Sequence, residues 1–313
     1  MTRVTPLRAE LGRRSAGRAS RPHTAFVLSG GASLGAMQAG MLRALYERGI
    51  APDLLVGTSV GALNAAFLAS RPPIVDTTDQ LAAVWRDLRR EQIFPLSLRA
   101  LLVGLSGRRD HLVPDRGLRQ LAARHIEFTD LAEAAIPLHV LTFDLSSRSE
   151  VLLSHGPTLD ILTAAASIPG VFPPVSIGGC LLVDGGVANN TPISHAVALG
   201  AERVFVLSTR ESHNANASGR SRGALGTAVD ALCQLADGRL QLDLERYCKD
   251  VEVIVLSAPN ALQVQPTDFG HATRLTKEAL NATRAFLAQR DSNRSPRRDR
   301  RMLESAHGLP SVA

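Results

Sequence analysis

Short apolar runs alternate along the chain with stretches in which apolar residues recur every three or four positions. The runs have the length of buried β-strands, whereas the recurring positions trace one face of a helix. The predicted strands are Thr24–Leu28, Leu54–Val56, Pro137–Leu145, Glu150–Leu153, Val204–Ser208 and Val251–Leu256. The predicted helices are Gly35–Arg48, Val60–Ala69, residues 79–90, Thr158–Ser167, Thr191–Leu199, Ala224–Tyr247 and Gly270–Ala288. This alternation predicts an α/β fold, a three-layer sandwich with a mainly parallel central sheet.

The positive charge of the chain is concentrated at its two ends. The formal net charge is +6, but residues 1–22 carry +5 and residues 290–313 carry +3, so the part between them carries −2. Neither end shows apolar periodicity, and we therefore expect two disordered basic tails around one domain spanning residues 23–289. Such tails are more often simple solvated ends than binding arms. The alternative is a peripheral contact with an anionic membrane; no specific nucleic-acid binding is expected.

The composition is that of an ordinary globular protein, with 45% hydrophobic and 20% charged residues. Because no run approaches 18 consecutive apolar residues, we expect no membrane-spanning helix. Cys180, Cys233 and Cys248 are scattered and have no metal-ligand spacing. This cysteine usage suits a reducing compartment, so we expect a cytoplasmic protein that needs no metal or cofactor. The oligomeric state is left open.

The sequence Gly57-Thr58-Ser59-Val60-Gly61 joins a predicted strand directly to a predicted helix. A serine on such a turn is pushed out of the backbone path, and the flanking glycines leave room for neighbouring elements. The amides of the following helix favour negative charge beside it. The alternative is a plain strand-to-helix turn in which the serine caps the helix. We interpret Ser59 as a candidate nucleophile.

A second loop between a strand and a helix is rich in small residues. It reads Gly30-Gly31-Ala32-Ser33-Leu34-Gly35. Backbone N–H groups in such a loop can stabilise the oxyanion of an acyl-transfer intermediate. The rival interpretation, a nucleotide phosphate loop, fails because no Lys-Ser/Thr pair follows Gly35 and Ala32 replaces the middle glycine. The loop alone remains a weak signal.

A third motif is Asp184-Gly185-Gly186, whose aspartate follows a short apolar run in the manner of a strand end; Asn189-Asn190-Thr191-Pro192 comes after it. An aspartate in this place is able to accept a hydrogen bond from a hydroxyl across a cleft. In isolation, an Asp-Gly turn would be the simpler interpretation.

Taken together and in this order, the three motifs resemble those of the patatin-like phospholipase family. The likeness covers about residues 24–288. It implies a serine hydrolase that cleaves the acyl esters of phospholipids, lysophospholipids or simple esters through a Ser59–Asp184 dyad and an acyl-enzyme. It further implies that backbone amides of Gly30, Gly31, Ala32 and Ser33 hold the oxyanion. The family's loop usually has a third glycine and then a basic residue, where this chain has Ala32 and Leu34; the alanine serves if its φ stays negative.

Several alternatives stay open. An ordinary catalytic triad would need a histidine after Asp184, and His195 and His271 are the candidates. The same acyl-enzyme would also serve an acyltransferase. A catalytically weak membrane-binding regulatory protein is a third class. The apolar stretch Phe94–Ser106 is interpreted either as a flap that touches lipid or, preferably, as a helix packed over the sheet.

Overall fold

A computed structural model describes residues 23–95, 111–210, 238–257 and 264–306. Its strands form one eight-stranded sheet in the order β5-β6-β3-β2-β1-β7-β8, with β4 paired to β3. The strands are β1 (Thr24–Leu28), β2 (Leu54–Thr58), β3 (Leu138–Asp144), β4 (Ser149–Leu153), β5 (Val175–Ile177), β6 (Cys180–Asp184), β7 (Arg203–Leu207) and β8 (Glu252–Leu256). The strands β3, β2, β1, β7 and β8 are parallel, whereas β4, β5 and β6 pair antiparallel.

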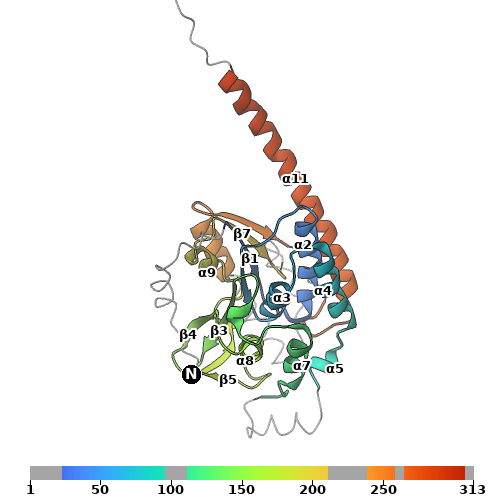
Figure 1. The fold of residues 1–313 in the computed structure, drawn as a ribbon, viewed down its shortest axis with the longest axis vertical. Helices are drawn as coiled ribbons and strands as arrows, with labels where there is room; N and C mark the ends of the chain where they lie inside the picture. The colour runs from blue at the N-terminus through green and yellow to red at the C-terminus, as the bar shows by residue number, and fades with distance from the viewer. Residues whose placement is uncertain (1–22, 96–110, 211–237, 258–263, 307–313) are drawn as a thin grey trace, which may run out of the picture.

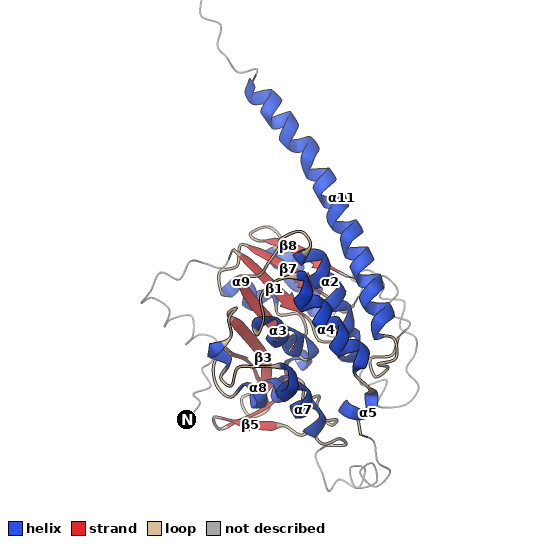
Figure 2. Cartoon of the chain, turned by 45° about the vertical axis from the view of Figure 1, so that its right-hand side comes forward, coloured by secondary structure: helices blue, strands red, loops and turns tan. Residues whose placement is uncertain are grey.

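Helices cover both faces of this sheet. The α-helices are α2 (Ala36–Tyr46), α3 (Val60–Ala69), α4 (Val75–Asp87), α5 (Arg90–Ile93), α7 (Arg116–His125), α8 (Thr158–Ala165), α9 (Ile193–Ala198) and α11 (Ala272–Ala306), and residues 238–247 are also helical. The 3-10 turns are η1 (Ala32–Gly35), η2 (Leu131–Glu133) and η3 (Gly185–Val187). Helices α2, α4 and α11 lie on one side of the sheet and α9 on the other (Figure 1, Figure 2). The structure thus confirms the predicted three-layer α/β sandwich.

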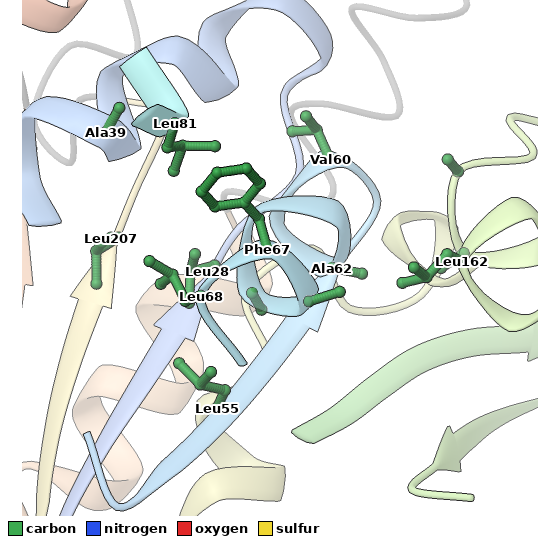
Figure 3. Packing of buried hydrophobic residues seen from close by; sticks show 14 of the residues in the cluster. Leu28, Ala39, Leu55, Val60, Ala62, Phe67, Leu68, Leu81, Leu162 and Leu207 are labelled. Carbon is green, nitrogen blue, oxygen red and sulfur yellow. The ribbon is translucent and has the colours of Figure 1, made fainter. Parts of the chain in front are cut away.

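The period-two pattern of the strands divides the core into two layers. In β1, Phe26 and Leu28 belong to the large cluster under α2, α3 and α4, while Ala25 and Val27 belong to the smaller cluster under α9. Figure 3 shows the large cluster, in which strand leucines such as Leu28 meet the side chains of α3. Both faces of β1 are buried, which explains its continuous apolar run.

The register of β3 brings the ends of two other strands together. Strand β2 pairs with the first half of β3, and Thr58 lies opposite Leu141. Strand β6 pairs with the second half, and Asp184 lies opposite Thr142. Because β4 occupies the other edge of β3, strands β2 and β6 share one edge and run toward each other. The residue after Thr58 therefore meets the end of β6.

Several boundaries differ from the sequence predictions. The helix expected at residues 79–90 is α4, which starts at Val75. Strand β5, which pairs with β6 in a hairpin, was not predicted, because a strand of three residues is too short to show a periodic pattern. The last helix does not end near Ala288; α11 continues to Ala306 and projects beyond the domain (Figure 1). Residues 290–306, which belong to the tail expected to be disordered, are thus helical in the structure. Arg, Met, Leu and Glu in this segment have high helix propensity.

Three sequence expectations fall mainly or wholly outside the described residues. These are the N-terminal tail at residues 1–22, the stretch Phe94–Ser106 after its second residue, and the first half of the helix expected at Ala224–Tyr247.

Candidate active site

Ser59 occupies a sharp turn between β2 and α3. Its backbone has φ 55° and ψ −130°, a conformation that residues other than glycine rarely adopt. The turn closes tightly around two glycines. A Cβ on Gly57 would lie 2.6 Å from Ala62 Cα, and one on Gly61 would lie 2.2 Å from the carbonyl oxygen of Leu28. The strained turn predicted from Gly57-Thr58-Ser59-Val60-Gly61 is thus present, and its serine is 8% exposed.

The glycine-rich loop between β1 and α2 lies directly against Ser59. A Cβ placed on Gly30 would be 2.9 Å from Ser59 Cβ. The Gly30 N–H donates to the carbonyl of Asn190 at 3.2 Å, and the Ser33 N–H donates to the carbonyl of Pro266 at 3.0 Å. Within the described part of the chain, no acceptor takes the N–H groups of Gly31 and Ala32. Of the four amides named from the sequence, these two are the ones available to a ligand.

Ala32 has a backbone conformation other than the one expected from the sequence. Its φ is +49° rather than negative, and its N–H group nevertheless has no acceptor among the described residues. The cause is the turn into η1, which places a left-handed residue at its first position. The third glycine of related loops is explained by the same geometry, because glycine adopts positive φ without strain.

We therefore expect Ala32→Gly to raise the stability of the protein. Relief of the left-handed alanine is worth up to about 1 kcal/mol, which shifts the melting temperature by roughly 2–4 °C in a domain of this size. Thermal unfolding measures the change, and Ala82→Gly inside helix α4 is the matched control, expected to lower stability by a similar amount. A lower melting temperature in Ala32→Gly would contradict the left-handed assignment.

Asp184 ends β6 beside Ser59 and is almost fully buried, at 5% exposure. Its Oδ1 accepts a hydrogen bond from the Gly186 N–H at 2.8 Å. Burial raises the pKa of Asp184 from 3.8 to about 6, and hydrogen bonds from the Ser59 side chain and the Gly186 N–H oppose this rise. Gly185 is needed for close packing, because a Cβ there would lie 2.7 Å from the carbonyl oxygen of Leu141.

Asn189 and Asn190 connect the three motifs to one another. The Thr58 hydroxyl donates to the Asn189 carbonyl at 3.3 Å. The backbone carbonyl of Asn190 accepts a hydrogen bond from the Gly30 N–H, and the side-chain Nδ2 of Asn190 lies 3.4 Å from the Gly30 carbonyl oxygen. No role was predicted for this pair from the sequence. The sequence signal for it is the position of two amide side chains directly after the Asp-Gly-Gly turn.

The two histidines considered for a triad lie elsewhere. His195 Nε2 is 2.6 Å from Glu150 Oε2, on the face of the sheet covered by α9. His271 is half-exposed and lies 3.4 Å from Asp268. In the part of the chain that the structure describes, the Asp184 carboxyl group has the Ser59 side chain and the Gly186 N–H as its hydrogen-bond partners.

An apolar pocket opens at Ser59. Among its described lining residues Ser59 supplies the one hydroxyl, while Ala32 and Val60 flank it. The far walls are aromatic, and their rings contact one another in sequence. The aromatic lining residues are Trp85, Phe94, Phe172 and Phe269. The pocket therefore offers a long apolar group access to the hydroxyl.

A strained serine, a buried carboxyl group beside it and two unengaged amides thus come from the three motifs, and Ser59 and Ala32 line the apolar pocket. The family model described as patatin-like phospholipase matches residues 26–197, which is more than half of the chain. The chain belongs to the patatin-like phospholipase family. Its matched segment contains all three motifs.

Relatives of this patatin-like protein include much longer chains. Lysophospholipase NTE1 of Mycosarcoma maydis is 30% identical over 189 residues, covering 58% of this chain and 9% of that protein. Patatin-like phospholipase domain-containing protein 7 of Mus musculus is 27% identical over 185 residues, covering 58% of this chain and 13% of that protein. The chain thus spans about a tenth of the length of these relatives.

Solved structures with a similar fold include human GIVD cytosolic phospholipase A2. It has a TM-score of 0.47 and 10% sequence identity, over 90% of this chain and 64% of that chain. VipD from Legionella pneumophila has a TM-score of 0.42 and 13% identity, over 85% of this chain and 67% of that chain.

Among the described residues, no helix is both long and apolar enough to cross a bilayer. Nor do they contain a group of three or more His, Cys, Asp or Glu side chains arranged to hold a metal ion.

Proposed function

We propose that this patatin-like protein is a serine hydrolase that cleaves the acyl ester bonds of lipids. The observation that carries the proposal is the pairing of the strained, pocket-facing Ser59 with the buried Asp184. A hydroxyl beside a carboxylate of raised pKa is a nucleophile beside its base. The family and the names of the relatives, lysophospholipase and patatin-like phospholipase, support the same reaction class.

The mechanism begins with proton transfer from Ser59 Oγ to the Asp184 carboxylate as Oγ attacks the ester carbonyl carbon. The carbonyl oxygen becomes an oxyanion, which the N–H groups of Gly31 and Ala32 stabilise. The intermediate then expels the alcohol, which takes the proton from Asp184. Water, deprotonated by Asp184, attacks the acyl-enzyme; the bond between the acyl carbon and Ser59 Oγ breaks, Asp184 returns the proton to Oγ, and the fatty acid is released. Burial supports this role because it brings the pKa of Asp184 closer to neutral pH, where proton transfer is most effective.

The pocket supports an acyl chain as the group held beside Ser59. Its aromatic and aliphatic walls favour burial of hydrocarbon by about 25 cal/mol per Å². At the position where the family usually has a basic residue, Leu34 is buried in the core and has no charge to offer a phosphate. We therefore propose selection by the acyl chain, with phospholipids, lysophospholipids and simple esters as substrates.

The direct test is labelling with a fluorophosphonate probe, which reacts with activated serines. Wild-type protein is expected to be labelled and Ser59→Ala to be unlabelled. A panel of phospholipids, lysophospholipids and simple esters then identifies the substrate, and added glycerol separates hydrolysis from acyl transfer by its products. Absence of both labelling and ester turnover in folded wild-type protein would favour the non-catalytic alternative.

The pKa of Asp184 predicts the pH dependence of this activity. The carboxylate must be ionised to accept the serine proton, so kcat/KM is expected to fall about tenfold per pH unit below its pKa of about 6. Above that value the profile should level off. Rates on a soluble ester from about pH 4.5 to about pH 8.5 measure the curve. A profile without an inflection near this pKa would contradict Asp184 as the base.

Contact with an anionic membrane through the basic ends of the chain remains a prediction. It is tested by binding to vesicles that contain anionic lipid, at low and high salt.

A further inference from the structure

A chain of buried polar side chains runs beneath the loop that presents Gly31 and Ala32. The indole Nε1–H of Trp85 donates to Asn64 Oδ1 at 3.0 Å, and Asn64 Nδ2 donates to Gln38 Oε1 at 2.8 Å. The three side chains come from α4, α3 and α2 and are 4%, 2% and 0% exposed, respectively. We call Gln38, Asn64 and Trp85 the amide chain.

The amide chain ends on the backbone at both limits of the loop. Gln38 Nε2 donates to the carbonyl of Ser29 at 2.9 Å and to that of Leu207 at 3.1 Å. Asn64 Nδ2 also donates to the carbonyl of Gly35 at 3.0 Å. Ser29 and Gly35 bracket the loop, so both of its ends are bonded to the same set of side chains.

The direction of these hydrogen bonds is determined by chemistry. An indole N–H can only donate, so the oxygen of Asn64 must face Trp85 and its NH₂ group must face Gln38. The oxygen of Gln38 then faces Asn64, and its NH₂ group faces the two backbone carbonyls. Both NH₂ groups use both of their protons, and no alternative arrangement satisfies all partners. The amide chain therefore has one orientation.

We propose that Gln38, Asn64 and Trp85 are positioning residues that hold the oxyanion loop in its catalytic conformation. The inference rests on the proposed function. The loop needs such support because Ala32 is left-handed at φ +49°, a conformation that persists only when its surroundings hold it. An N–H group that moves by about 1 Å loses most of its effect on the oxyanion. The opposite side of the loop is held independently, because the Thr209 hydroxyl donates to the Gly30 carbonyl.

The test compares kcat and KM of two variants on a short p-nitrophenyl ester. Gln38→Met retains the size of the side chain and removes its hydrogen bonds, and Trp85→Phe retains an apolar pocket wall and removes the N–H. Each is expected to lower kcat about tenfold to a hundredfold while KM changes by less than about threefold, because the loop acts on the transition state. The double variant is expected to be scarcely worse than the poorer single variant, since residues of one unit lose activity non-additively.

The matched control is Thr78→Val on α4, the helix that carries Trp85. It removes one buried hydrogen bond, from Thr78 Oγ1 to the Val75 carbonyl at 2.6 Å, away from the pocket and the loop. Its kcat is expected to stay within about twofold of wild type, although its melting temperature falls by a few degrees. Thermal unfolding of each variant identifies the folded proteins. If Gln38→Met does not fold, Trp85→Phe carries the comparison.

The outcomes separate the inference from the proposed function. Wild-type protein that neither turns over esters nor reacts with a fluorophosphonate would overturn the proposed function itself. Active wild type with normal kcat in folded Gln38→Met and Trp85→Phe would overturn only the positioning role. Raised KM with unchanged kcat would overturn it too, because it would assign the amide chain to substrate binding.

Discussion

Ser59→Ala and Asp184→Asn are each expected to lower ester turnover by about four to six orders of magnitude. In the proposed mechanism Ser59 supplies the attacking oxygen, and Asp184 is the carboxylate to which its hydroxyl is hydrogen-bonded. Because the two groups act as one unit, the double variant should be scarcely slower than either single variant. Turnover of a p-nitrophenyl ester measures the loss, and fluorophosphonate labelling reports Ser59 independently. Near-normal turnover in Asp184→Asn, with loss in His195→Ala or His271→Ala, would instead support a triad.

Asp184→Asn should also stabilise the folded protein at neutral pH. Burial raises the pKa of Asp184 from 3.8 to about 6. A carboxyl group with a raised folded-state pKa favours folding while protonated, below about pH 4, and this contribution is lost as the pH rises through about 6. Above that pH, the buried charge costs up to about 3 kcal/mol, which asparagine avoids. Melting at about pH 8 should show the gain, and it should vanish near pH 4.

Gly61→Ala is expected to lower the free energy of unfolding by about 3 kcal/mol or more and to abolish turnover. The added Cβ would lie 2.2 Å from the Leu28 carbonyl oxygen and 2.6 Å from that of Ser29. Both are backbone atoms of the strand and loop beside the elbow, so neither can rotate away. The added methyl group therefore forces either the helix after Ser59 or the oxyanion loop to shift.

The control for this substitution is Gly238→Ala, at a helical glycine with no atom within 4 Å of the added Cβ. It should leave turnover unchanged and raise stability slightly, because alanine favours helix. Chemical denaturation compares the two variants. A Gly61→Ala protein as stable as wild type would show that the contact between elbow and loop is looser than its geometry indicates.

The sequence predicted the features of the site that depend on neighbours along the chain. A strand, a small-residue turn and a helix in succession identify the elbow at Ser59, because the turn geometry is local. The conformation of Ala32 was not predictable in this way. Its φ and the freedom of its N–H depend on Asn190 and Pro266, which are distant in the sequence and bind the amides on either side of it.

The difference between local and long-range determinants also explains which parts of the fold could be predicted from the sequence. Buried parallel strands such as β1 and β7 were recognised because their apolar runs are continuous. The hairpin of β5 and β6 has short strands, and its place at one edge of β3 depends on the register of pairing. The length of α11 was underestimated because the residues after Ala288 show no apolar periodicity, whereas the individual propensities of its arginines favour a helix.

The meeting of β2 and β6 on one edge of β3 has a consequence for the chain during its synthesis. The elbow and the oxyanion loop lie in the first fifth of the sequence, but Asp184 and Asn190 arrive only after β3 and β4 are complete. A nascent chain that has folded its first strands thus holds Ser59 without Asp184 beside it and a Gly30 amide without its acceptor. Synthesis proceeds from the N-terminus at about 5–20 residues per second, so this interval lasts several seconds or longer. The site around Ser59 is therefore complete only after β6 and the residues that follow it have been made.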